Sequence, residues 1–157
     1  IDDGCRRILC LRSNSRMRMP ANKRTDAYLD VVEQAGLSAL VREVEFVKPD
    51  DEKGAVVAKI LDENPDIDGI FAGDDTMAAI CLNVMKQRGL SAPDDIKVVG
   101  ADGARRTMTF MPDLTTVRQD IDRIGELAAQ SIIALINGDN PESNIKLPVE
   151  LIEGKTA

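Results

Sequence analysis

The sequence has no histidine and no tryptophan, and only one tyrosine and three phenylalanines occur among its 157 residues. The lack of histidine nearly excludes the usual zinc sites and acid–base catalysis that depends on an imidazole. Cysteine is also scarce: Cys5, Cys10 and Cys81 are an odd number, no CxxC motif occurs, and two of the three lie in apolar patterns. We therefore expect reduced, buried thiols, as in cytoplasmic proteins, and no metal site.

Long hydrophobic runs are absent as well. No apolar run approaches the roughly 18–20 residues that a membrane-spanning helix needs. The N-terminal segment IDDGCRRILC carries charges inside any apolar core that a signal peptide would require. We therefore expect a cytoplasmic location and no membrane partner. The chain starts at Ile1 rather than at a methionine, directly before a predicted strand, which indicates a fragment of a longer protein.

Basic residues are outnumbered by acidic ones. The chain has 20 Lys and Arg and 27 Asp and Glu, which gives a net charge of −7 and a pI of about 4.7. Neutralising phosphates needs a basic surface, so this balance argues against nucleic-acid binding by the chain itself. Seven of the cations fall within residues 1–24, which we interpret as a solvated basic rim. A content of 43% hydrophobic and 30% charged residues is typical of one globular domain with a real core.

The residues that are present form an alternation of predicted strands and helices. Strands are expected at residues 7–11, 40–47, 67–72, 96–100, 114–117 and 145–152, and helices at residues 22–34, 50–64, 76–88 and 121–136. Apolar residues recur at helical spacing in the helical segments, and Pro65 ends the second of them. Strand–helix alternation with short connections predicts an α/β fold, with a mainly parallel sheet and helices on both faces.

Two of the predicted strands end in short polar motifs. Gly73-Asp74-Asp75 follows the strand at 67–72, and Gly100-Ala101-Asp102 follows the strand at 96–100. In open α/β sheets ligands bind beyond the carboxyl ends of the strands, so these motifs are candidates for a binding site. We expect Asp75 to cap the next helix and Asp74 to point into the crevice; the alternative is that both carboxylates only cap the helix.

Six segments carry a family resemblance. They are, in order along the chain, GCRRI, KRTDAY, DGIFAGDDTMA, PDDIKVVGADG, PDLTTVRQD and LPVELIEGKT. Each is weak alone, but the ordered set covers nearly the whole chain. Together they resemble the effector-binding region of the lactose-repressor (LacI/GalR) family of transcriptional repressors, which is related to periplasmic sugar-binding proteins.

The resemblance implies a division of the chain. Members of this family have an N-terminal helix-turn-helix head that binds DNA, a hinge helix and a two-lobed effector domain. Residues 1–118 resemble the second lobe, residues 119–140 a crossover and a helix that belong to the first lobe, and residues 141–157 a strand that returns to the second lobe. The head and the hinge are not in this chain, so operator DNA would be bound only through a helix-turn-helix outside it. No cofactor is implied.

The resemblance also implies effector-binding positions. A sugar or sugar phosphate would be held by Arg24, Asp74, Asp102 and Gln119. Asp74 stands where many family members have asparagine, a change that removes a donor and adds a charge. Two simpler interpretations stay open: Arg24 could be a surface residue of its helix, and Asp102 a turn residue that supports Gly103.

Other positions depart from the family pattern. Arg16 and Arg18 lie in a segment that is difficult to align; if they face the cleft, they favour a phosphorylated sugar. The family often has an aromatic residue where this chain has Ala101, so we expect any stacking on a sugar ring to come from the first lobe.

Two apolar surfaces are expected to need a partner. Met108, Phe110 and Met111 lie near the place where the resemblance puts a dimer contact, which favours a homodimer. The helix at 121–136 carries an apolar stripe whose partner in the family is the first lobe. We expect this helix either to fold back on its own sheet or to pack against another copy of the chain. The stripe consists of Ile121, Ile124, Ala128, Ile132 and Leu135.

Three functions are compatible with these patterns. The resemblance favours the effector-binding region of a sugar-responsive, DNA-binding transcriptional regulator, which is not an enzyme. The alternative is a periplasmic-type sugar-binding transport protein of the same fold, which the lack of a signal peptide and the unpaired cysteines disfavour. A glycoside hydrolase would use Asp74 and Asp102 as a carboxylate pair, but no nucleophile, base or metal set supports it.

Overall fold

The computed structural model describes residues 1–14 and 21–157 and shows an α/β fold, as expected. One six-stranded sheet has the order β2-β1-β3-β4-β5-β6, and every neighbouring pair is parallel except β5–β6. The strands are β1 (Ile8–Asn14), β2 (Leu40–Glu45), β3 (Gly69–Ala72), β4 (Lys97–Asp102), β5 (Thr115–Gln119) and β6 (Val149–Ile152). The helices are α1 (Ala21–Gln34), α2 (Asp50–Glu63), α3 (Asp75–Gln87), α4 (Arg105–Phe110) and α5 (Ile121–Ile136).

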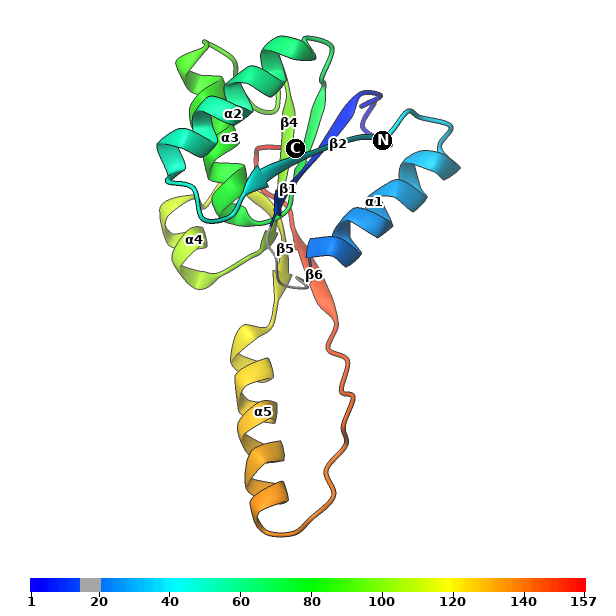
Figure 1. The fold of residues 1–157 in the computed structure, drawn as a ribbon, viewed down its shortest axis with the longest axis vertical. Helices are drawn as coiled ribbons and strands as arrows, with labels where there is room; N and C mark the ends of the chain where they lie inside the picture. Colours follow the sequence, from blue (N-terminus) through cyan, green and yellow to red (C-terminus); the bar gives the residue numbers. More distant parts are fainter. Residues whose placement is uncertain (15–20) are drawn as a thin grey trace.

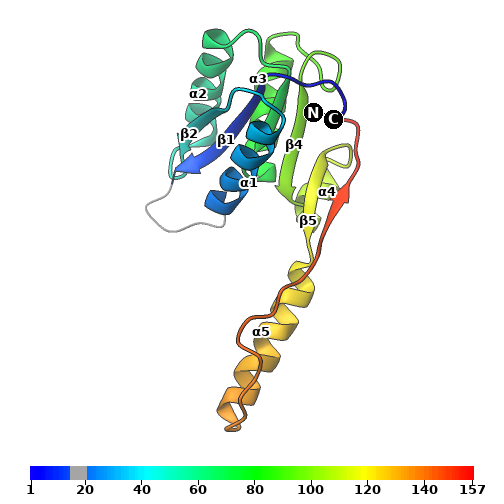
Figure 2. The same cartoon turned by 90° about the vertical axis from the view of Figure 1, so that its right-hand side faces the viewer.

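Helices cover both faces of the sheet, with α2 and α3 on one face and α1 on the other (Figures 1 and 2). Alternate side chains of β1 pack on opposite faces of the sheet, because successive residues of a strand point to opposite faces. Leu9 and Leu11 join the main core beneath α2 and α3, whereas Cys10 packs with Tyr28 and Val32 of α1. The helical spacing of apolar residues in 76–88 predicts an inner stripe on α3, and all five of its residues are buried: Met77, Ile80, Cys81, Val84 and Met85.

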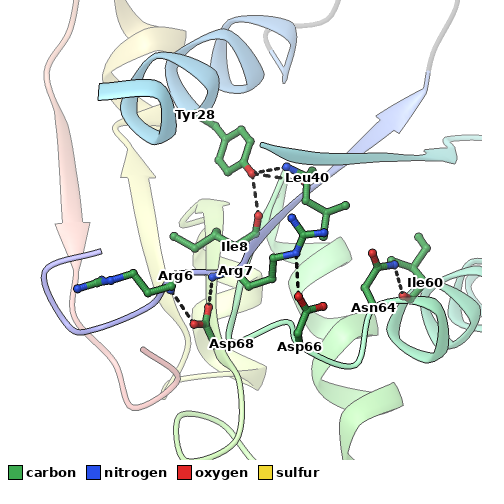
Figure 3. A network of polar contacts seen from close by, with 9 residues as sticks. All are labelled: Arg6, Arg7, Ile8, Tyr28, Leu40, Ile60, Asn64, Asp66 and Asp68. Carbon is green, nitrogen blue, oxygen red and sulfur yellow. Dashed lines mark hydrogen bonds and ion pairs between the residues drawn. The ribbon is translucent and has the colours of Figure 1, made fainter. Parts of the chain in front are cut away.

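The buried face of α1 differs from the one that the spacing of apolar residues indicates. The helical spacing of Ala27, Val31 and Val32 predicts a shared inner face, but Ala27 and Val31 are exposed, and Tyr28 is buried in their place. Figure 3 shows why: the Tyr28 hydroxyl donates to the Ile8 carbonyl at 2.7 Å and accepts from the Leu40 amide at 2.9 Å. One phenol therefore satisfies groups on β1 and β2 and fixes the rotation of α1 about its axis.

A second set of polar contacts ties the amino-terminal end of the sheet together. The Asp68 carboxylate, just before β3, accepts from the backbone amides of Arg6 and Arg7 at 2.6 and 2.8 Å, just before β1 (Figure 3). The Arg7 side chain also pairs with Asp66, 3.2 Å away. These contacts lie at the edge opposite to the carboxyl ends of the strands.

The three cysteines are buried and free, as the sequence predicts. Burial raises the pKa of the Cys81 thiol to about 12, and the negative charge of Asp74 acts in the same direction. Cys81 is therefore a protonated, apolar core residue rather than a nucleophile.

The C-terminal third differs from expectation in three respects. Helix α4 was not predicted; it has only six residues, and none of them is buried. Strand β6 is shorter than the expected 145–152, because only Val149–Ile152 pairs with β5. Helix α5 does not fold back on the sheet, so that alternative was wrong: it projects from the body, and the segment from Asn137 to Pro148 runs alongside it (Figures 1 and 2). The stripe on α5 is mostly solvent-exposed within this chain.

No helix in the part of the chain that the structure describes is both long and apolar enough to cross a membrane.

The Tyr28 contacts predict a specific loss of stability. Replacing Tyr28 with Phe removes the hydroxyl and leaves the buried Leu40 amide without its acceptor, which costs about 1–3 kcal/mol of unfolding free energy. Urea denaturation followed by circular dichroism measures the change. Val31→Ala on the exposed side of the same helix is the matched control and is expected to stay within about 0.5 kcal/mol of the parent chain. Equal unfolding midpoints for Tyr28→Phe and the parent would contradict the assigned role.

Candidate functional site

A cavity of about 510 Å³ opens at the carboxyl edge of the sheet. Ser13, Gly73, Asp102 and Gln119 reach it from the ends of β1, β3, β4 and β5, because parallel strands all end at the same edge. The four residues expected to bind an effector are all in its wall, so the expected convergence of Arg24, Asp74 and Asp102 is confirmed. The full lining is Ser13, Arg24, Phe46, Lys53, Gly73, Asp74, Thr76, Met77, Ile80, Asp102 and Gln119.

Asp102 is the centre of the polar contacts in this cavity. Its Oδ1 accepts from the Arg24 guanidinium at 2.5 Å and from the Gln119 amide nitrogen at 2.7 Å. Arg24 also donates to the Gly73 carbonyl, so its planar group is held at two points. Asp102 has a φ of +111°, which is rare for a residue with a side chain, and Gly103 follows with a φ of +59°. This turn aims the carboxylate back across the end of the sheet.

Asp74 faces the cavity as expected, but it also takes the capping role that was expected of Asp75. Asp74, not Asp75, is the N-cap of α3: its Oδ1 accepts from the Met77 amide at 2.8 Å. The helix begins one residue earlier than expected, so Asp75 lies in its first turn and points into the protein. The N-terminus of α3 lies at the cavity, so Asp74 both caps α3 and lines the cavity.

Asp75 is only 3% exposed, yet it is well hydrogen-bonded. One carboxylate oxygen accepts from the Thr116 hydroxyl at 2.5 Å, and the other accepts from the Gly103 amide at 2.8 Å. Burial raises the pKa of Asp75, and these two hydrogen bonds oppose that rise. The second carboxylate of the pair thus links three parts of the chain beneath the cavity.

Phe46 and Lys53 are among the cavity-wall side chains that sequence reasoning missed. Phe46 is 49% exposed there, and the Lys53 ammonium lies 5.9 Å from the centre of its ring, within range of a cation–π contact. The expectation placed aromatic surface on the first lobe only, but Phe46 supplies some on this lobe. The signal was present, since Phe46 follows β2 at the same edge of the sheet.

The other positions singled out from the sequence are two arginines considered for the cleft and three residues expected at a dimer contact. Arg16 and Arg18 lie outside the residues that the structure describes. Met108 and Phe110 are on α4, where Phe110 is 75% exposed, and Met111 packs partly against the main core. Their part in a dimer contact stays a prediction.

The cavity holds a balanced set of hydrogen-bonding groups rather than a metal centre. Two carboxylates, a guanidinium, an ammonium, an amide and two hydroxyls line one space. Within residues 1–14 and 21–157, no group of three or more His, Cys, Asp or Glu residues is placed to hold a metal ion. Such a surface fits a small polar molecule that both donates and accepts hydrogen bonds.

Comparison with known families agrees with this geometry. The sequence matches the periplasmic binding protein-like domain family over residues 1–157. The chain belongs to this family. The match over residues 1–157 agrees with the order of motifs along the chain and with the observed fold.

The curated relatives include sugar-operon repressors. The sucrose operon repressor of Lactococcus lactis is 32% identical over 154 residues, which are 98% of this chain and 47% of the relative. The ribose operon repressor of Halalkalibacterium halodurans is 30% identical over 157 residues, which are 99% of this chain and 46% of the relative. The chain spans about half the length of the curated relatives it matches.

Solved structures show the same fold. A LacI-family regulator from Arthrobacter sp. FB24 in complex with lactose has a TM-score of 0.83 at 26% identity, over 99% of this chain and 58% of that one. The complex of the transcriptional regulator CelR with cellobiose has a TM-score of 0.86 at 27% identity, over 99% of this chain and 48% of that one. The resemblance to LacI/GalR regulators seen in the sequence is thereby confirmed.

The two functions of Asp74 can be separated by substitution. Asp74→Ala removes the cap of α3 and is expected to cost about 1 kcal/mol of unfolding free energy, whereas Asp74→Asn keeps a capping oxygen and stays within a few tenths. Urea denaturation of the two variants measures this difference. Equal losses from alanine and asparagine would show that the side chain does not stabilise α3 by capping.

Proposed function

We propose that this chain is part of the effector-binding region of a sugar-responsive transcriptional regulator. The observation that carries the proposal is the cavity at the carboxyl edge, where Arg24, Asp74, Asp102 and Gln119 meet. Relatives named as sucrose and ribose operon repressors, and regulators solved with lactose and cellobiose, support a sugar as the effector.

The chemistry of the cavity suits sugar hydroxyls, because each hydroxyl donates one hydrogen bond and accepts others. Carboxylates can only accept, and the guanidinium of Arg24 can only donate, so the two types together serve both needs. Both internal hydrogen bonds of Asp102 fall on Oδ1, which leaves Oδ2 for a ligand hydroxyl. Phe46 adds an apolar surface on which the carbon face of a sugar ring can rest. A neutral sugar and a sugar phosphate both remain candidates.

The relatives are about twice as long as this chain, so the proposal also covers parts of the protein outside it. Residues 1–118 and 141–157 would form the second lobe, and residues 119–140, with the exposed stripe of α5, would pack on a first lobe outside this chain. A helix-turn-helix, also outside it, would bind operator DNA. Two copies would meet near Met108, Phe110 and Met111, and the protein would work in the cytoplasm, as expected of bacterial repressors.

An enzymatic role has less support in the geometry. The Asp102 carboxylate is held by Arg24 and Gln119, and Asp74 caps a helix. Both groups accept hydrogen bonds as carboxylates, whereas a glycosidase acid must carry a proton to the leaving group. The relatives are regulators rather than hydrolases or transport proteins.

Replacing Asp102 tests the site directly. In the protein at its natural length, Asp102→Ala should weaken binding of the effector sugar by about 1–3 kcal/mol, because Arg24 and Gln119 lose their acceptor and the sugar loses one too. Titration calorimetry with sucrose, ribose, lactose and cellobiose measures the change. Asp113→Ala, which removes an exposed carboxylate paired with Lys155, is the control. Unchanged affinity in Asp102→Ala would refute the assignment.

A second test concerns the missing wall of the site. A two-lobed domain closes both walls over its ligand and excludes water, and on the proposed division the second wall would come from a first lobe outside this chain. The 157-residue chain alone should therefore bind these sugars far more weakly than the protein at its natural length. Calorimetry on both forms measures the ratio, and micromolar binding by the chain alone would contradict a site shared between two lobes.

A further inference from the structure

Asp75 is a buried carboxylate that lies outside the cavity lining. It is absent from the cavity wall, although its neighbour Asp74 is part of that wall. It is nonetheless almost fully enclosed, at 3% exposure, and both of its oxygens accept hydrogen bonds from other elements. Burying a carboxylate is costly unless it is well hydrogen-bonded, so its retention here needs a reason.

The partners of Asp75 connect it to three neighbouring strands. Asp75 itself follows β3, the Gly103 amide follows β4, and Thr116 is on β5. Residues of the cavity wall lie next to two of these points, namely Asp74 beside Asp75 and Asp102 beside Gly103. The Asp75 carboxylate therefore ties the backbone beside Asp102 to the start of α3 and to β5.

The surroundings of Asp75 are shaped to admit it. A Cβ atom on Gly100 would lie 2.5 Å from Asp75 Oδ1, so a side chain there would collide with the carboxylate. The turn that follows is also unusual, because Asp102 has a φ of +111°, and a Cβ atom on Gly103 would lie 2.6 Å from the Arg118 Cα. Such a backbone conformation persists only where surrounding contacts hold it, and the bond from the Gly103 amide to Asp75 is one of them.

We propose that Asp75 is a positioning residue of the sugar site: through the Gly103 amide and the Thr116 hydroxyl it holds Asp102 in its binding orientation without touching the ligand. This role rests on the proposed function of the cavity. It assigns the paired carboxylates different tasks, since Asp74 faces the ligand and Asp75 fixes the frame. It also makes the carboxylate of Asp75 replaceable only by a side chain that can accept from the Gly103 amide.

The test compares variants in the protein at its natural length, with sucrose, ribose, lactose and cellobiose as probes in calorimetry. Asp75→Ala should weaken the binding of the recognised sugar at least about tenfold, because Gly103 and Thr116 lose their shared acceptor. Asp75→Asn should restore affinity to within about threefold, since its amide oxygen accepts from Gly103 and its nitrogen donates to Thr116. Thr116→Val, which keeps the bond from Gly103 and the size of the side chain, should give a smaller loss.

The matched control and a double-mutant cycle separate positioning from stability. Asp68→Ala removes a carboxylate that also accepts from two backbone amides, but at the opposite edge of the sheet, and should leave affinity unchanged. In an Asp102→Ala background, the further loss from Asp75→Ala should fall below about twofold, because both residues act through one contact. Two results would overturn the proposal, provided that Asp102→Ala still weakens binding. One is full additivity of the losses from Asp75→Ala and Asp102→Ala, and the other is normal affinity in both Asp75→Ala and Thr116→Val.

A readout without ligand completes the test. Hydrogen exchange of the Gly103 amide should be at least about tenfold faster in Asp75→Ala than in the parent and unchanged in Asp68→Ala, because only the first variant removes its acceptor. If Asp75→Ala fails to fold, the Thr116→Val affinity decides. If Asp102→Ala binds as the parent does, the proposed function fails, whereas an unchanged Gly103 exchange rate in Asp75→Ala overturns the positioning role alone.

Discussion

The parallel pairing of β1, β3, β4 and β5 is the constraint on which the site depends. The strands pair in the order β1-β3-β4-β5, and all four run in the same direction. Residues from sequence positions 13 to 119 therefore reach one edge of the sheet. The hydrophobic core beneath α2 and α3 holds this order, because β1, β3 and β4 all contribute buried side chains to it. The cavity is a consequence of strand direction more than of any single loop.

Charge in the cavity is arranged in partnered groups. The Arg24 guanidinium lies between the Gly73 carbonyl and Asp102, and the Lys53 ammonium lies 3.2 Å from Asp50. An isolated charge in a partly enclosed site is expensive, so pairing lets the cavity keep strong hydrogen-bonding groups at modest cost. The same pairing fixes the geometry of each group before a ligand arrives, which reduces the ordering that binding must produce.

The molecule combines a packed body with a projecting arm. The body has helices on both faces of its sheet, whereas α5 and the segment that returns from it leave the body after β5 and come back at β6 (Figure 1). The returning chain is fixed in the body beyond β6, where the Thr156 hydroxyl accepts from the Thr115 amide and donates to the Val98 carbonyl. An amphipathic helix with an exposed apolar stripe is an incomplete layer, and its completion requires another folded unit.

The sequence by itself determined the alternation of elements, the sheet with helices on both faces, and the edge at which Arg24, Asp74, Asp102 and Gln119 meet. The alternation, the sheet and the placing of Asp74 and Asp102 follow from local periodicity and strand direction, which are properties of short segments. Arg24 and Gln119 were expected there from the family resemblance of their motifs. Only the tertiary structure decided which carboxylate caps α3 and which face of α1 is buried. Each of these depends on partners distant in sequence: Gly103 and Thr116 draw Asp75 inward, and Ile8 and Leu40 hold Tyr28. Periodicity cannot register such contacts, because they join residues that no local pattern connects.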